Sequence, residues 1–76
     1  MIEQYVIKTR NDEDEYLAYN KGKDVFYLTN QLSQAEKYYN VEAARKWIDV
    51  QVLKDSKYKS DIYKIVQALE FVARGV

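Results

Sequence analysis

The stretch EYLAYNKGKDVFYLT, residues 15–29, decides how the first half of the chain folds. Two runs rich in aromatic and aliphatic residues, 15–19 and 24–29, flank the polar segment 20–23. Two such runs around a short polar segment with a glycine predict a β-hairpin. Gly22 is expected to supply the positive φ that a tight hairpin loop needs.

A third strand is predicted just before this hairpin. Residues 5–10, YVIKTR, alternate in character, with Val6 and Lys8 on one side and Tyr5 and Ile7 on the other. The polar residues 11–14 then interrupt the pattern and form a first turn. Three short strands on tight turns predict an antiparallel meander.

Helical signals begin after Asn30. Ser33 and Glu36 are spaced as in a capping box, which predicts a short helix through about Tyr39. Asn40 is a good N-cap for a second helix, and Glu42 lies near the positive end of that helix.

The second predicted helix has an apolar face. Ala44, Trp47 and Ile48 share that face, so Trp47 is expected to pack in the core against the sheet. Gln51 falls in the middle of the same face. The helix is therefore expected to fray or end between residues 50 and 54.

The C-terminal segment 62–73 has two possible structures. Its apolar residues recur at helical spacing, with Ser60 as a possible cap, whereas residues 62–66 also have strand propensity. The prediction for residues 1–76 is one small α+β domain. A three-stranded antiparallel meander packs on one or two helices, and the C-terminal segment adds a strand or a further helix.

The composition limits the chemistry that this chain can perform. The 76 residues contain no Cys and no His, which excludes disulfides, thiolate or imidazole metal ligands, and Cys or His nucleophiles. A chain this short also has little means to build a preorganised catalytic site. We therefore expect no enzyme activity, no cofactor and no bound metal.

Charge and hydropathy indicate where the chain acts. Twelve Lys/Arg balance twelve Asp/Glu, so no overall field attracts the chain to DNA or to an anionic membrane. Glu3 stands where a signal peptide carries its basic region, and no apolar run is long enough to span a membrane. The expected location is the cytoplasm, without membrane association.

The acidic run at residues 12–15 has no pattern of a catalytic or calcium-binding site. In an EF-hand loop that started at Asp12, the glycine position would be Leu17, inside a predicted strand. A solvated turn that discourages edge-to-edge strand pairing is the favoured interpretation. Alternatively, Asp12, Glu13 and Asp14 form an acidic prong that enters a basic groove on a partner.

Eight tyrosines are the unusual feature of the composition. Tyrosine is favoured in protein interfaces because its ring is apolar and its tip is polar. The predicted strand registers place aromatic rings on both faces of the sheet, so a partner protein or a second copy could cover one face. The candidate protein-binding residues are Tyr5, Tyr16, Tyr19 and Tyr27, together with Asp12, Glu13 and Asp14.

A basic and aromatic segment offers an alternative binding function. Lysines interleaved with tyrosine can hold a nucleic-acid strand by phosphate contacts and base stacking. The residues concerned are Lys54, Lys57, Tyr58 and Lys59. Because the chain is neutral and carries no recognised nucleic-acid motif, a solvated connector is the favoured interpretation, and nucleic acid is the less favoured partner.

The order of these signals resembles a group of small phage and prophage proteins of Gram-positive bacteria. The resemblance covers about residues 4–48 and rests on the three strand runs followed by LSQAEKY at 32–38 and VEAARKWI at 41–48. It implies that a strand follows the Glu-Ala helix. It also implies an accessory protein that binds and modulates or inhibits a larger host or phage protein. It assigns no functional residues.

Overall fold

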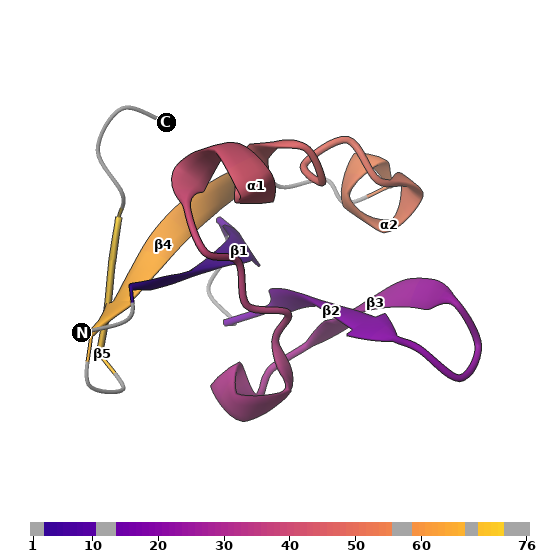
Figure 1. Cartoon of the computed structure of the whole chain (residues 1–76). Coiled ribbons are helices and arrows are strands. Elements are labelled where there is room, and N and C mark those ends of the chain that lie inside the picture. The colour runs from indigo at the N-terminus through magenta and orange to yellow at the C-terminus, as the bar shows by residue number, and fades with distance from the viewer. Residues whose placement is uncertain (1–2, 11–13, 56–58, 67–68, 73–76) are drawn as a thin grey trace.

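The computed structural model describes residues 3–10, 14–55, 59–66 and 69–72. Five strands form one antiparallel sheet in the order β3-β2-β1-β4-β5 (Figure 1). The predicted three-stranded meander is confirmed. The C-terminal segment, for which the sequence allows a strand or a helix, begins with strand β4, which pairs with β1. The strands are β1 Gln4–Thr9, β2 Tyr16–Asn20, β3 Val25–Thr29, β4 Ser60–Val66 and β5 Leu69–Val72.

Short helical segments lie on both sides of this sheet. Helices α1 (Val41–Arg45) and α2 (Gln51–Lys54) lie on one side, and the 3-10 turn η1 (Leu32–Gln34) lies on the other (Figure 1). We call these sides the helix face and the η1 face. The predicted α+β class is confirmed.

The main core lies between the sheet and the two α-helices. Ile7 on β1 is opposite Ile62 on β4, and both side chains are completely buried. Leu17 from β2, Ala44 from α1 and Leu53 from α2 complete its centre. A smaller cluster on the η1 face contains Val6, Tyr16 and Ala35. Burial of both faces explains why the strands carry apolar residues on each side.

The chain crosses the sheet between β1 and β2. These two strands pair at the Lys8 and Tyr16 end, and residues 36–38 pass between their other ends. The Tyr5 amide donates to the Tyr38 carbonyl at 2.9 Å, and the Tyr38 amide donates to the Tyr5 carbonyl at 2.8 Å. This passage carries the chain from η1 on one face to α1 on the other.

The helix predicted from Ser33 to Tyr39 is wrong. Only Leu32–Gln34 forms a single 3-10 turn, and no side chain caps it. The Glu36 amide donates to the Leu17 carbonyl at 3.0 Å instead of bonding within a helix. Lys37 then turns its ammonium group to the Leu32 and Ala35 carbonyls, and burial lowers its pKa. Pairing with the strands therefore replaces the capping box.

The predicted N-cap of α1 is confirmed. The Asn40 side-chain oxygen accepts a hydrogen bond from the Ala43 amide at 2.7 Å, which satisfies one of the free amides of the first turn. Ala44 is completely buried, as its position on the apolar face predicts. Ile48 is partly buried against the same core.

The predicted length of α1 and the predicted burial of Trp47 are both wrong. The helix ends at Arg45, and α2 starts at Gln51 as a separate element. After Arg45 the amides bond three residues back: Trp47 donates to Ala44 at 3.0 Å and Ile48 to Arg45 at 3.3 Å. This tighter turn changes the angle between successive side chains and leaves Trp47 43% exposed.

Two ion pairs connect β1 and the residues beside it to β4. Glu3 lies 2.8 Å from the Lys64 ammonium, which lowers the pKa of Glu3 and raises that of Lys64. The Arg10 guanidinium holds the Asp61 carboxylate in a two-pronged contact, which raises the pKa of Arg10. Glu3, Arg10 and Lys64 are partly exposed to solvent, so apolar burial holds β4 in place more than these charges do.

We expect Tyr38→Phe to stabilise the fold. The Tyr38 hydroxyl is buried without a hydrogen-bond partner among the described residues, and burial raises its pKa. An unpaired buried hydroxyl costs about 1–3 kcal/mol, and the phenylalanine variant keeps both backbone bonds to Tyr5. The melting temperature should rise by several degrees. Tyr39→Phe is the matched control because the neighbouring Tyr39 is 81% exposed. A less stable Tyr38→Phe variant would mean that the hydroxyl has a partner.

Candidate functional site

Three aromatic rings line a pocket at the hairpin end of the helix face. Tyr19 on β2 pairs with Phe26 on β3, so both side chains point to the same face, with ring centroids 4.8 Å apart. Trp47 packs beside Phe26 at 5.3 Å. The pocket has a volume of about 370 Å³. We call it the aromatic pocket; its six residues are Tyr19, Lys21, Asp24, Phe26, Glu36 and Trp47.

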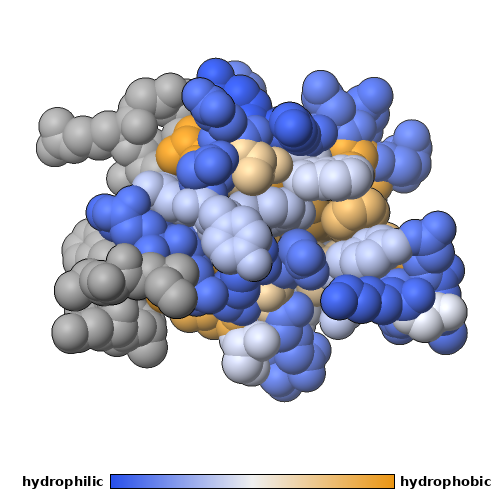
Figure 2. Space-filling model, in the orientation of Figure 1, coloured by the Kyte–Doolittle hydropathy of each residue, from blue (hydrophilic) through white to orange (hydrophobic). Residues whose placement is uncertain are grey.

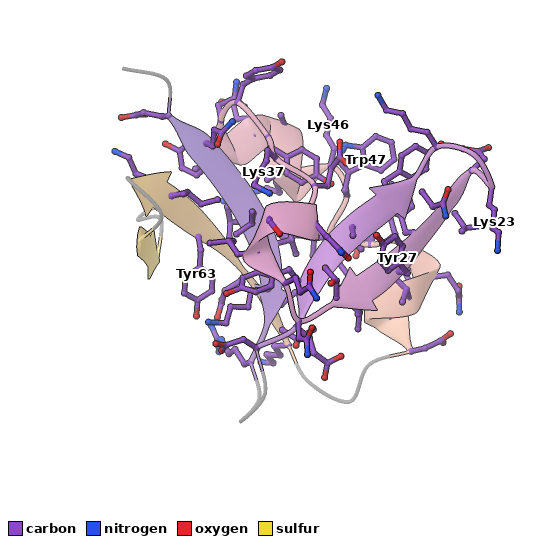
Figure 3. All side chains as sticks on the ribbon, turned by 90° about the horizontal axis from the view of Figure 1, so that it is seen from below. Lys23, Tyr27, Lys37, Lys46, Trp47 and Tyr63 are labelled. Carbon is purple, nitrogen blue, oxygen red and sulfur yellow. The ribbon has the colours of Figure 1, made fainter. Side chains whose placement is uncertain are left out.

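Three separate parts of the chain build this pocket. The hairpin supplies Lys21 and Asp24 at the rim, the segment that crosses the sheet supplies Glu36, and the turn after α1 supplies Trp47. Figure 3 shows Trp47 and Lys46 on one side of the molecule and Tyr63 at the opposite, β4 side. Figure 2 shows a largely hydrophilic surface with smaller hydrophobic patches, some of them between the helix layer and the β2–β3 hairpin.

The aromatic pocket fits one inserted side chain better than a large cofactor. Its volume is near the lower end of the range for small-molecule sites, about 300–1,000 Å³. The rings give an apolar floor, and the carboxylates of Asp24 and Glu36 with the Lys21 ammonium give a polar rim. Such a site can hold an apolar anchor and bond a polar group beside it.

Asp24 fixes the geometry of the hairpin. Its backbone has φ 54°, in the left-handed region that aspartate tolerates better than most residues. The Tyr19 hydroxyl donates to its carboxylate, which holds the Tyr19 ring at the pocket.

The prediction that Gly22 takes the positive φ is wrong. The loop has four residues, the Lys23 amide bonds the Asn20 side chain, and the left-handed residue comes last, before β3.

We expect Asp24→Gly to be more stable than Asp24→Ala by about 1 kcal/mol. Both variants lose the carboxylate that accepts from Tyr19, so this loss cancels in the comparison. The alanine side chain is strained at positive φ, whereas glycine is not. Urea unfolding of the two variants measures the difference. Equal stability of the two would show that residue 24 does not hold the left-handed conformation.

Two of the four predicted tyrosines do not belong to the exposed surface. Tyr5 is buried in the main core and Tyr16 in the smaller cluster, because residues 35–38 cover both of them. Tyr19 is half-buried and reaches the aromatic pocket. Tyr27 is 37% exposed on β3, on the η1 face. The predicted surface of strand tyrosines is thus reduced to Tyr19 and Tyr27.

The acidic prong is described only in part. Asp12 and Glu13 lie outside the described residues. Asp14 forms an ion pair with Lys8 at 3.0 Å. The Lys8 ammonium also lies over the rings of Tyr16 and Tyr63, at 5.6 and 4.8 Å from their centroids. Asp14 therefore anchors the first turn to the sheet.

The basic segment is also described in part. Lys57 and Tyr58 lie outside the described residues. Lys54 and Lys59 line one pocket of about 300 Å³ beside Asp49. The fold thus brings two of the four predicted nucleic-acid contacts together, with a carboxylate next to them.

Prediction from the sequence missed Phe26, Trp47 and the polar rim. One signal was present for Phe26: Tyr19 and Phe26 are equally distant from the middle of the 20–25 turn, so a hairpin places them on one face. No comparable signal exists for Trp47, because its exposure depends on where α1 ends.

Comparison with known proteins gave no match to a family model, a curated protein or a solved structure. The described residues contain no group of three or more His, Cys, Asp or Glu side chains placed to hold a metal ion. Among these residues, no helix has the length and apolar character needed to cross a membrane.

Proposed function

We propose that this chain acts without catalysis, by binding another protein through the aromatic pocket and so modulating or inhibiting it. The observation that carries the proposal is the cluster of Tyr19, Phe26 and Trp47, in which Trp47 stays 43% exposed. A few residues carry most of the binding energy of a protein interface, and tryptophan and tyrosine are enriched among them. The resemblance to phage accessory proteins supports the same kind of function, in the cytoplasm of a host cell.

The chemistry of the pocket indicates what a partner must present. An apolar or aromatic side chain fits the floor formed by the three rings. Hydrogen-bond donors or a basic group beside that anchor can bond the carboxylates of Asp24 and Glu36. A partner loop that carries an apolar residue next to a lysine or arginine meets both requirements.

The absence of catalysis is part of the proposal. The sequence contains neither His nor Cys, so an acid–base or nucleophilic mechanism would depend on other side chains. Asp24 accepts a hydrogen bond from Tyr19, so it serves as an acceptor, which is also the role that partner binding requires of it. Binding is a function that the residues of the aromatic pocket can perform as they stand.

Affinity capture tests the proposal. The tagged chain is incubated with bacterial lysate, with and without nuclease, and the captured proteins are identified by mass spectrometry. Trp47→Ala serves as the matched bait. We expect one stoichiometric protein that survives nuclease and is lost with Trp47→Ala. Equal capture by both baits would assign binding to another surface.

A second candidate function is nucleic-acid binding. The observation that favours it is the placement of Lys54 and Lys59 at one pocket. Binding of an oligonucleotide should then weaken steeply with salt and disappear in the variant with Lys54→Glu and Lys59→Glu. Capture of nucleic acid alone, lost at raised salt, would replace the protein-binding proposal with this one.

A further inference from the structure

The outer edge of β3 has unpaired backbone groups. β3 is the last strand of the sheet and pairs with β2 on one side only. In the described part of the chain, residues 25–29 form no backbone hydrogen bond except to β2. Every second residue of an antiparallel strand directs its N–H and C=O away from its neighbour. The free side of β3 therefore presents a row of donors and acceptors.

This edge lacks the usual protection against strand pairing. Natural edge strands carry lysine, proline or a bulge that blocks a further strand. The β3 sequence VFYLT has no charge and no proline, and Val25 and Tyr27 are 46% and 37% exposed. After Thr29 the chain turns inward, because Ala35 just beyond η1 packs against Val6 and Tyr16. The chain thus leaves β3 toward the centre of the sheet.

We propose that β3 pairs antiparallel with β3 of a second copy, centred on Tyr27, so that two sheets join into one. In this register Tyr27 meets its own counterpart, Phe26 meets Leu28, and Val25 meets Thr29. Phe26 and Leu28 lie on the helix face, and Tyr27 lies on the η1 face, as their partners on β2 show. Aromatic and β-branched cross-strand pairs of this kind stabilise a sheet.

The charge pattern of β3 favours a second copy of this chain as the strand that pairs with its free edge. A two-fold pairing sets the strand against itself, so a charged residue near its centre would meet a like charge. The run from Val25 to Leu32 contains none. In the same register Asp24 lies opposite Asn30 and Lys23 opposite Gln31, so no like charges meet at the ends either. The net charge of zero also means that two copies do not repel each other overall.

The self-pairing inference stands apart from the proposed partner protein. It uses the in-plane edge of β3, whereas the aromatic pocket lies on the helix face and includes Phe26 as its only β3 residue. If the chain does not dimerise, affinity capture still tests the proposed partner protein. If no partner is captured, sedimentation velocity still tests self-pairing through β3.

Sedimentation velocity over a micromolar to millimolar range tests self-pairing. We expect the wild-type chain to form dimers as its concentration rises. Tyr27→Lys places two ammonium groups opposite each other and should weaken dimerisation at least about tenfold. Tyr39→Lys is the matched control, because Tyr39 is exposed and lies outside the sheet. It should dimerise like the wild type.

A mixing experiment identifies the register. Tyr27→Lys and Tyr27→Glu should each dimerise at least about tenfold more weakly than the wild type, and an equimolar mixture should associate more tightly than either variant alone because opposite charges then meet. Circular dichroism of each variant checks that the fold is kept. A wild type that stays monomeric throughout, a Tyr27→Lys variant that dimerises like the wild type, or a mixture that associates no better than the separate variants would each overturn the proposal.

Discussion

Replacing Ile62 with alanine is expected to lower the free energy of unfolding by about 3 kcal/mol. Ile62 is completely buried, lies opposite Ile7 on β1, and packs beneath α1 and α2. Truncation removes the apolar surface that attaches β4 to the rest of the sheet. It also leaves a cavity that the surrounding strands cannot close.

The effect is large because the whole fold is small. At about 0.05–0.15 kcal/mol per residue, a chain of 76 residues has roughly 4–11 kcal/mol of stability in total. The loss at Ile62 should lower the melting temperature by more than about 10 °C. Ile62→Val is the graded control, with an expected loss of about 1 kcal/mol. Thermal and urea unfolding followed by circular dichroism measure both variants.

The Ile62 experiment also tests the position of β4. If Ile62→Ala were as stable as Ile62→Val, the segment 60–66 would not pack against β1. The sequence left that segment open between strand and helix, because its apolar residues satisfy both periods. The residues that pair between β1 and β4 are more than fifty positions apart along the chain, so the local sequence pattern carries no information about this pairing.

The meander could be predicted because its signals are local. Each strand run is bounded by a turn. The observed strand limits differ from the predicted ones by no more than one residue at any end. The Asn40 cap was predictable for the same reason, since its bond reaches only to Ala43. Both predictions were accurate because their interacting residues are neighbours in sequence.

Prediction failed where distant segments compete for the same backbone groups. Ser33 and Glu36 have the spacing of a capping box, but the Glu36 amide bonds Leu17 and Tyr38 pairs with Tyr5. A single turn of helix is stabilised too weakly to resist such pairing. The buried rings of Tyr5 and Tyr16 follow from the same crossing, because the segment that fails to form a helix covers them.

The candidate site was only partly predictable for a related reason. Tyr19 and Tyr27 were identified from strand alternation, and the pairing of Tyr19 with Phe26 follows from the hairpin. Trp47 was assigned to the core on the assumption that α1 continues past Arg45. Because α1 ends at Arg45, two residues before Trp47, a residue predicted for the core lies at the surface.

Trp47→Ala is expected to weaken binding of the captured partner at least about 30-fold. A central interface tryptophan is typically worth about 2 kcal/mol or more, and each 1.4 kcal/mol changes affinity about tenfold. Trp47 stays 43% exposed, so its loss should destabilise the fold by about 2 kcal/mol, less than the truncation of a fully buried tryptophan. A loss of affinity in a variant that circular dichroism shows to be folded would distinguish a contact residue from a core residue.

Trp47 also supplies its own readout, because it is the only tryptophan in the chain. Its emission should shift to shorter wavelength when a partner without tryptophan excludes water from the pocket. Tyr39→Ala is the control: Tyr39 is 81% exposed and lies outside the pocket, so that variant should bind like the wild type. An unchanged emission together with wild-type affinity of Trp47→Ala would remove the aromatic pocket from the binding surface. The η1 face around Tyr27 would then be the next surface to test.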